Sequence, residues 1–345
     1  MQCTCFIIPP DVLERLAKGK DVPEATRQAL LNTIELDKLW RKIRQLHTDA
    51  VRRSNLLLGV SAIVLATAPA VTVYDTKHTT TLPGTLVPNP GASKDLTAKR
   101  AFDETTAVAQ FYQTCFGRNS ADNRGMTLMS TIHYGVRYNN AFWNGAQMTY
   151  GDGDGNLFLD FTLSNDVIGH ELTHGVTQYT AGLGYTNEAG GLNESISDVF
   201  GSLFRQWRAN QTFAQADWLI GAGIMGPAAK AAGYTCLRDL ANPGASHCLS
   251  PQPSNYKQYV PGSNPHVSSG IPNYAFYLVA KAIGGHAWDK AGKIWYAALT
   301  SGRTTKNMSF KAFAALTRAA ATSLYPGDAS VYAAVDGGWK AVGVP

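Results

Sequence analysis

The sequence predicts an α+β fold in which a strand-rich region precedes a helix-rich one. Three observations support this prediction. Residues 11–53 are highly charged and carry apolar residues at helical spacing. Residues 54–165 mix β-branched runs with turn signals such as "TLPG", "NPGAS" and "GDGDG". After residue 166, segments with helical spacing predominate.

Each region has recognisable elements. Pro23 is typical of a helix start, so we expect a second N-terminal helix from there to about residue 53. The composition changes abruptly at Ser54, where we place a boundary. One helix is expected near residues 103–116, within the strand-rich region. Three later segments have helical spacing with Gly or Pro near their ends, at residues 270–285, 289–301 and 309–325.

The composition is that of an ordinary soluble globular protein. The chain has 345 residues and a net charge of +5, and its length allows about two domains. Lys and Arg are scattered along the sequence, whereas nucleic-acid binding requires a concentrated basic surface. We therefore expect no nucleic-acid partner.

The cysteines do not form a disulfide framework, because five is an odd number in a large chain. Cys236 and Cys248 could close one loop in an oxidising compartment. Two separate thiols are the equal alternative.

No signal peptide is expected at Met1, because the start lacks basic residues and Pro9-Pro10 interrupts its apolar run. This predicts a cytoplasmic protein, or one released by a non-classical route. Residues 54–74 are uncharged and near spanning length, so secretion or membrane tethering through them is the alternative. Their β-branched content favours buried strands, and membrane attachment is not expected.

The segment "VIGHELTHGV" suggests a metal site. His170 and His174 are one helical turn apart, so both imidazoles can bind a single metal from one face. Glu171 lies beside them, where it can deprotonate a metal-bound water. Asn165 or Asp166 is the expected N-cap of this helix. Alone the pattern is weak, since an ordinary helix with satisfied polar residues can contain it.

A third ligand is available in "GLNESISDVFGSLFRQW". Its apolar residues follow helical spacing after Asn193, the expected N-cap. Glu194 and Asp198 share another face of that helix. An acidic residue in a first turn often only complements the helix dipole. Next to a two-histidine helix, however, Glu194 is better explained as a ligand and Asp198 as the carboxylate that fixes a ligand histidine's tautomer.

Taken together, "GHELTHGVTQYTAGLGYTNEAGGLNESISDVFG" resembles the zinc-binding core of the thermolysin-like metallopeptidases. The stretches "VYDTKHTTTLPG", "TIHYGVRYNNAFWNGAQMTYGDGDG" and "HVSSGIPNYAFYLVAKAIGG" resemble the same family. The resemblance covers roughly residues 70–345. It implies a two-lobed fold, with a β-rich N-terminal lobe, a mainly helical C-terminal lobe and one Zn²⁺ in the cleft between them.

The resemblance also implies a role for each motif residue. His170, His174 and Glu194 would bind zinc, and Glu171 would be the general base. Tyr185, in "GLGY", and His266, in "NPHVSSG", would stabilise the oxyanion of the tetrahedral intermediate, since both can donate hydrogen bonds.

Other matching residues would bind substrate. Arg238, in "CLRDLANP", would hold the substrate backbone. Asn140 and Ala141, in "NNAFWNG", would pair with an extended peptide. The family's apolar pocket for the residue after the scissile bond would be formed by Phe158, Val167, Ile220, Ile224 and Leu237.

The sequence departs from the family at two places. An aspartate usually precedes the equivalent of His266 by five positions and orients it, but "YVPGSNPH" has no acid, and Asn264 is the available substitute. Arg205 stands where secreted relatives have a glutamate calcium ligand, and Leu219 and Ala222 replace expected acids. Calcium needs several oxygen ligands, so we expect the double calcium site to be absent or much reduced.

The N-terminal "CTCFIIPPDVLERLA" resembles the short propeptide of the protealysin-like branch of this family. It implies an inhibitory segment over residues 1–55 that is removed by self-cleavage, followed by lobes at residues 56–165 and 166–345. Cys3 or Cys5, as a thiolate, could bind the open position of the zinc. The alternative is that both cysteines simply lie near a mobile chain terminus and bind no metal.

The predicted function is that of a neutral zinc endopeptidase, made as a zymogen, which cleaves peptides before apolar residues by a Glu-activated zinc-bound water. Its partners would be peptide or protein substrates and its own propeptide. "GAGIMG" fits a dinucleotide fingerprint, but Pro227 follows it and no repeated strand–helix–strand units surround it. A catalytically dead homologue that acts as a binding module is the other alternative.

Overall fold

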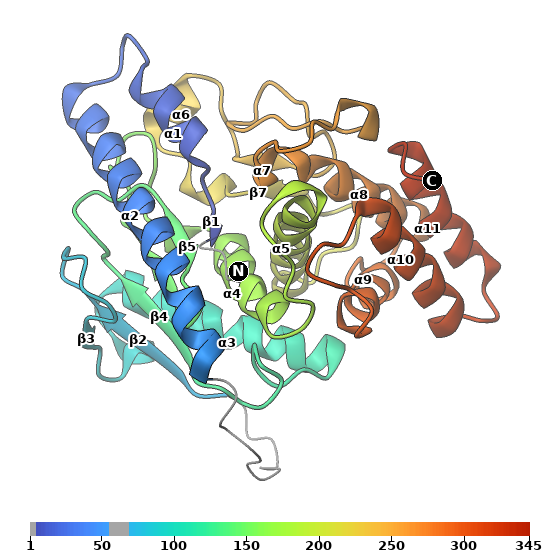
Figure 1. Cartoon of the computed structure of the whole chain (residues 1–345). Coiled ribbons are helices and arrows are strands. Elements are labelled where there is room, and N and C mark those ends of the chain that lie inside the picture. Colours follow the sequence, from blue (N-terminus) through green and yellow to red (C-terminus); the bar gives the residue numbers. More distant parts are fainter. Residues whose placement is uncertain (1–4, 55–68) are drawn as a thin grey trace.

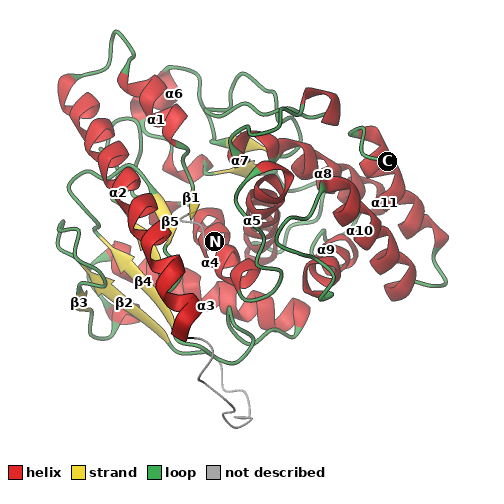
Figure 2. Cartoon of the chain, in the orientation of Figure 1, coloured by secondary structure: helices red, strands yellow, loops and turns green. Residues whose placement is uncertain are grey.

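A computed structural model describes residues 5–54 and 69–345 and confirms the α+β fold. Strands lie on one side of the molecule and most helices on the other (Figure 2). The strands are β1 (Cys5–Phe6), β2 (Val71–Asp75), β3 (Thr85–Leu86), β4 (Leu128–Ile132), β5 (Ala141–Trp143), β6 (Met148–Tyr150), β7 (Leu219–Ile220) and β8 (Arg238–Asp239). The α-helices are α1 (Pro10–Ala17), α2 (Glu24–Ser54), α3 (Leu96–Phe116), α4 (Asn165–Gln178), α5 (Asn187–Arg208), α6 (Pro227–Ala231), α7 (Pro265–Ser268), α8 (Gly270–Ile283), α9 (Lys290–Thr300), α10 (Phe310–Leu324) and α11 (Ala329–Ala341).

Six strands form one mixed sheet in the order β1-β5-β6-β4-β2-β3. The neighbours β2, β4 and β6 run parallel, and the outer pairs are antiparallel. The N-terminal strand β1 is therefore an edge strand that pairs with β5, with Phe6 opposite Phe142.

Helix α2 lies on the strand side of the molecule (Figure 1), and its side chains form hydrogen bonds with residues 134–140, between β4 and β5. Its buried residues recur at helical spacing: Thr26, Ala29, Leu30, Thr33, Ile34 and Asp37. Trp40 also donates from Nε1 to the Tyr134 hydroxyl, at 2.6 Å.

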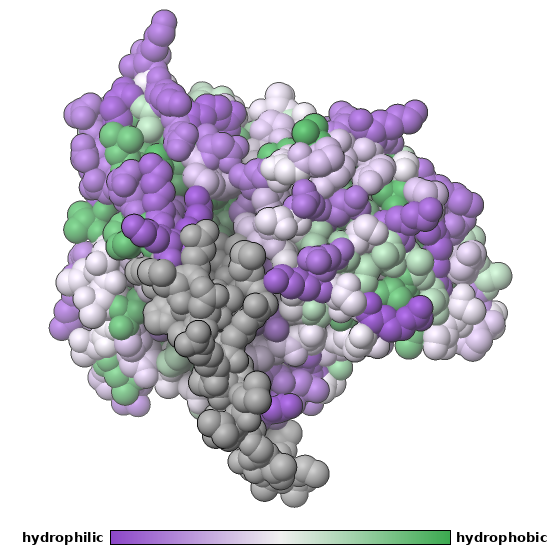
Figure 3. Space-filling view, in the orientation of Figure 1, coloured by the Kyte–Doolittle hydropathy of each residue, from purple (hydrophilic) through white to green (hydrophobic). Residues whose placement is uncertain are grey.

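Hydrophilic residues dominate the face of the molecule seen in Figure 3, where apolar residues appear in small groups.

One large hydrophobic cluster extends from Ile7 to Val344 and joins the two lobes. Helices α4 and α5 lie within it and are buried on nearly all sides. They can approach closely because glycines face each other: a Cβ on Gly169 would lie 3.0 Å from the Gly201 Cα, and one on Gly201 would lie 2.5 Å from the Asp166 carbonyl oxygen.

Several expected boundaries need correction. Ser164 is the N-cap of α4, rather than Asn165 or Asp166. Helix α5 begins at Asn187, so Asn193 lies inside it and is not a cap. Helix α3 begins at Leu96, earlier than predicted, because the Asp95 side chain caps it.

The apolar stretch at residues 54–74 is described only in part. Its last residues belong to β2, as expected for a strand, and residues 55–68, including the predicted cleavage junction at Asn55, lie outside the described residues. In the part of the chain described, no helix combines the length and apolar character needed to cross a membrane.

Candidate active site

Helices α4 and α5 bring three metal-binding side chains together. The Nε2 atoms of His170 and His174 lie 3.0 Å apart. Glu194, from α5, places Oε2 3.4 Å from the His170 Nε2 and Oε1 3.6 Å from the His174 Nε2. All three side chains are buried.

The opposite ring nitrogens fix both tautomers. His170 Nδ1 lies 2.9 Å from Asp198 Oδ1. His174 Nδ1 lies 3.0 Å from Asn193 Oδ1 and 3.0 Å from Ser197 Oγ. These contacts are satisfied by protons on both Nδ1 atoms, and they direct the two Nε2 atoms toward each other and toward Glu194.

This donor set fits a zinc ion. Two imidazole nitrogens and a carboxylate that face one another this closely need a proton or a metal cation between them. Glu194 Oε2 is also buried without a hydrogen-bond partner among the described residues. Two imidazoles and one carboxylate, with tautomers fixed from behind, are the ligands of a catalytic zinc site.

Without the cation, the electrostatics of the ligands are strongly perturbed. Burial alone would lower the pKa of His170, but contacts with Asp198 and Glu194 raise that pKa to about 10. Burial alone would raise the pKa of Glu194, but the surrounding histidines hold that pKa well below its usual range. The carboxylate is therefore ionised and available to a metal.

Glu171 is buried beside this cluster. Neither of its carboxylate oxygens has a hydrogen-bond partner of normal geometry among the described residues. Burial raises the pKa of Glu171 to about 8, against the opposing effects of the His170 charge and of the Trp143 backbone. A carboxylate in such surroundings is a strong base for its residue type.

Arg238 and Asp198 form a buried pair next to the histidines. Arg238 donates from Nε and Nη2 to the two Asp198 oxygens, at 2.8 and 2.7 Å. Asn273 donates a further hydrogen bond to Asp198 Oδ2, at 2.9 Å. Burial would raise the pKa of Asp198, but the Arg238 charge and the His170 contact hold it far below its usual range.

His266 and Tyr185 both contact Glu194 as well. His266 Nε2 is 3.2 Å from Glu194 Oε2, and the Tyr185 hydroxyl donates to Glu194 Oε1. Asn264 Oδ1 lies 3.2 Å from His266 Nδ1, where the sequence lacks the expected acid. Burial, outweighing the attraction of Glu194, lowers the pKa of His266 to about 4.

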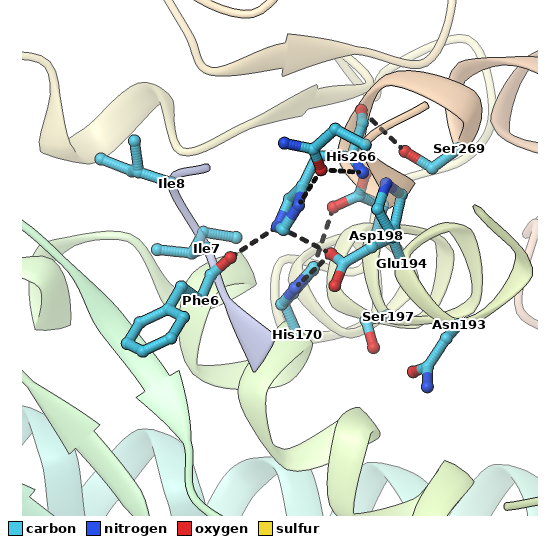
Figure 4. Close-up of polar contacts among 12 residues, drawn as sticks. Phe6, Ile7, Ile8, His170, Asn193, Glu194, Ser197, Asp198, His266 and Ser269 are labelled. Atoms are coloured by element: carbon cyan, nitrogen blue, oxygen red, sulfur yellow. Dashed lines mark hydrogen bonds and ion pairs between the residues drawn. The ribbon is translucent and has the colours of Figure 1, made fainter. Parts of the chain in front are cut away.

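The N-terminal segment passes beside these residues as an extended strand (Figure 4). The Phe6 carbonyl oxygen is 2.5 Å from His266 Nε2. The next residue, Ile7, donates its N–H to the Ala141 carbonyl and accepts from Arg238 Nη1, both at 3.0 Å.

Ile8 continues the pattern. Its N–H donates to Asn140 Oδ1 and its carbonyl accepts from Asn140 Nδ2, both at 3.0 Å. The main chain of residues 6–8 thus contacts Arg238, Ala141 and Asn140, which the sequence predicts to bind the substrate backbone. It also contacts His266, which the sequence predicts to stabilise the oxyanion.

Cys5 points toward the ligand cluster. Its Sγ, a donor atom of His174 and one of Glu194 all lie within 4.8 Å of one another. Cys3 lies outside the described residues.

The five predicted pocket residues are all buried in the large cluster that also contains Ile7. Phe158 forms a bridge with Met225, and the Leu237 N–H donates to the Ile220 carbonyl at 2.8 Å. The structure therefore places Phe158, Val167, Ile220, Ile224 and Leu237 in one apolar body with the Ile7 side chain.

Sequence reasoning missed three supporting residues. Asn193 and Ser197 hold His174, and Asn273 holds Asp198. Asn193 and Ser197 are one turn apart on the ligand helix, which was a usable signal. Asn273, 75 positions from Asp198, offered none.

Arg205 occupies the region of the expected calcium ligands. Its guanidinium forms a salt bridge with Asp217, and its Nη1 lies 4.0 Å from Asp166 Oδ2. A fixed positive charge therefore lies beside two acids there.

Two family models match the chain. Residues 50–178 match the catalytic domain of thermolysin metallopeptidase, and residues 181–344 match its alpha-helical domain. An extracellular metalloprotease of Pectobacterium carotovorum subsp. carotovorum is 38% identical over 99% of this chain and 96% of that relative. Protease PrtS of Photorhabdus sp. (strain Az29) is 38% identical over 98% of this chain and 91% of that relative.

A solved structure extends the similarity to the N-terminal segment. The precursor of protealysin, a metalloproteinase from Serratia proteamaculans, superposes with a TM-score of 0.84 at 37% identity. The match covers 99% of this chain and all of that one. The chain is therefore a member of the thermolysin metallopeptidase family and shares the overall structure of a precursor form.

Proposed function

We propose that His170, His174 and Glu194 bind the catalytic zinc of this metallopeptidase, and that residues 5–8 inhibit it by lying in the substrate cleft. The main-chain contacts of Phe6, Ile7 and Ile8 carry the proposal. They use only groups that every peptide possesses, so an extended substrate can make the same contacts after the N-terminal segment leaves.

Zn²⁺ at this site would polarise the substrate carbonyl and acidify the attacking water. Glu171 accepts the proton of that water at its carboxylate and passes it to the leaving nitrogen. His266 Nε2 and the Tyr185 hydroxyl donate hydrogen bonds to the developing oxyanion. The Phe6 carbonyl, 2.5 Å from His266 Nε2, indicates where the substrate carbonyl would lie.

The position of Ile7 supports cleavage before apolar residues. Ile7 directly follows the carbonyl that His266 contacts, and its apolar side chain is fully buried. A charged side chain at this position would lose its hydration without a partner.

Inhibition would rest on more than the strand. Asp11, in α1, accepts from Asn264 Nδ2 at 2.8 Å, and Asn264 in turn contacts His266. Cys5 would supply a thiolate to the zinc in place of water. The N-terminal segment thereby binds both the metal site and the oxyanion donor.

We also propose that the double calcium site is absent. Arg205 binds Asp217 and lies near Asp166, so a cation is already provided by the chain. A divalent ion at the same acids would meet the guanidinium charge.

Metal dependence tests the assignment most simply. An internally quenched peptide with isoleucine after the scissile bond should be cleaved by the processed enzyme. A chelator should abolish cleavage and one equivalent of zinc should restore it. Glu171→Ala should retain zinc but lose activity by about 10²–10⁴-fold. Chelator-resistant cleavage, or an active Glu171→Ala, contradicts the proposal.

A further inference from the structure

Four titratable side chains meet outside the catalytic cleft, at the C-terminal ends of the parallel strands of the six-stranded sheet. These strands are β2, β4 and β6, and His78, His133 and Asp152 follow them within three residues. Asp95, the N-cap of α3, completes the group.

The distances within the group are short. Asp152 Oδ1 lies 2.7 Å from His133 Nδ1, and Asp152 Oδ2 lies 3.3 Å from His78 Nδ1. His133 Nε2 lies 3.0 Å from Asp95 Oδ2. Asp95 is itself fixed, because its Oδ1 accepts from the Thr97 N–H at 2.9 Å.

Asp95 has the role at His133 that Asp198 has at His170. With the His133 proton on Nε2 and directed at Asp95, its Nδ1 lone pair faces the Asp152 carboxylate. Two acceptors 2.7 Å apart require a proton or a cation between them. A protonated His133 held between Asp95 and Asp152 would explain the contacts of His133, but not why His78 lies against the second oxygen of Asp152. A metal ion bound by His78, His133 and Asp152 explains both.

The backbone holds the two imidazoles in place. His78 and His133 both have positive φ, at 63° and 53°. Residues other than glycine adopt this conformation at a cost that the surrounding structure must offset. The His78 N–H donates to the His133 carbonyl at 2.9 Å, and Thr76 Oγ1 donates to the same carbonyl at 2.6 Å.

We propose that His78, His133 and Asp152 form a second metal site, which binds a divalent transition ion such as Zn²⁺. The donor atoms lie within 4.8 Å of one another, and the set of two imidazoles and one carboxylate is the same as in the catalytic cleft. Asp95 orients His133 for binding. The His78 side chain is 55% exposed, so an ion can enter from solvent. Once bound, it would tie together the ends of three strands that are far apart in sequence.

Counting zinc tests the proposal without measuring activity. The full chain carrying Glu171→Ala, which prevents self-processing, is dialysed against micromolar free zinc and its bound metal is counted by native mass spectrometry. Two equivalents are expected. Adding His78→Asn, which removes an imidazole but tolerates positive φ, should leave one equivalent. By titration calorimetry this change should weaken the second site at least about tenfold.

His286→Asn is the matched control, because His286 is another partly exposed histidine that lies outside the cluster. It should retain both equivalents. Asp152→Asn gives a second test should His78→Asn fold poorly, and it should also lose the second ion. A chain that stops at one equivalent contradicts the proposal. So does a second equivalent that survives both substitutions, since the ion would then lie elsewhere, for example at Cys236, His247 and Cys248.

Discussion

Asn140 shows how completely the N-terminal segment occupies the cleft. Its amide oxygen accepts from the Ile8 N–H, and its amide nitrogen donates both to the Ile8 carbonyl and to Asp37 of α2. A substrate that used Asn140 in the same way would have to displace Ile8 first. The same residue is therefore expected to serve both the docked N-terminal segment and the substrate.

Asp37 is expected to make the stability of this packing depend on pH. Burial raises the pKa of Asp37 to about 7, despite hydrogen bonds from Tyr138 and Asn140 and the nearby Arg41 charge. Tyr134 is a further titratable group that interacts electrostatically with Asp37. The folded state binds the Asp37 proton more tightly than the unfolded chain does. The stabilisation that protonated Asp37 gives to the folded state is therefore complete below about pH 4 and is lost as the pH rises to about 7.

We therefore expect Asp37→Asn to flatten the pH dependence of stability. Both proteins carry Glu171→Ala and are unfolded in urea. Between pH 5 and pH 7 the free energy of unfolding of the protein that retains Asp37 should fall relative to that of Asp37→Asn, by up to about 1.4 kcal/mol per pH unit. Parallel curves for the two proteins would mean that Asp37 titrates normally.

Cys5 is the residue expected to bind the zinc in the zymogen. Cys5→Ser removes a good zinc ligand and should accelerate self-processing of the full chain by about tenfold or more, as followed on gels. Cys115→Ser, on α3, is the control and should process like wild type. Cobalt substitution adds an optical test, because only a protein with Cys5 should give a sulfur-to-cobalt band. Equal processing rates would refute a role for Cys5.

At the scale of elements, the contact between α4 and α5 sets the geometry of the metal ligands. A Cβ at Gly201 would meet the Asp166 carbonyl oxygen at 2.5 Å, so the helices would have to separate. Gly201→Ala should lower the free energy of unfolding by about 1–3 kcal/mol and weaken zinc binding in a chelator competition.

Gly337→Ala provides the control for that substitution. Gly337 lies in helix α11 and has no heavy atom within 4 Å of an added Cβ. It should leave zinc affinity unchanged and stability equal or up to about 1 kcal/mol higher. Similar effects of the two substitutions would mean that the close helix contact is unimportant for the site.

Arg205, on α5, should replace calcium as the partner of Asp166 and Asp217. Calcium or a calcium-selective chelator should leave the melting temperature unchanged. Arg205→Ala should lower stability by about 1–3 kcal/mol, because buried Asp166 loses a nearby positive charge. A clear calcium-dependent rise in the melting temperature of the wild type would contradict the proposed absence of the site.

Local patterns predicted the elements of the site well and their ends poorly. Helical spacing placed His170 and His174 on one face, as found. The same reasoning made Asn193 a cap, although α5 begins six residues earlier. A cap and a helix-interior residue that holds a ligand need the same side-chain oxygen, so residue type could not distinguish them.

At the scale of the molecule, contacts between distant segments were beyond the sequence. The family resemblance supplied both lobes and the residues that we expect to bind substrate. Nothing local shows that Ile7 pairs with Ala141 or that Asp11 reaches Asn264, because such contacts depend on how the whole chain packs. The group of His78, His133 and Asp152 could not be predicted for the same reason, since its members follow three separate strands. The limits of the N-terminal segment and the location of the protein stay predictions.

The most direct test of the zymogen account is intact-mass spectrometry of the full-length wild type beside Glu171→Ala, followed over time. We expect that only the wild type loses an N-terminal fragment ending near residue 55, and that peptide cleavage appears as the fragment is lost. Processing of Glu171→Ala in pure solution at the wild-type rate would contradict it. So would a wild type that cleaves peptides at full rate while residues 5–8 remain attached and bound in the cleft.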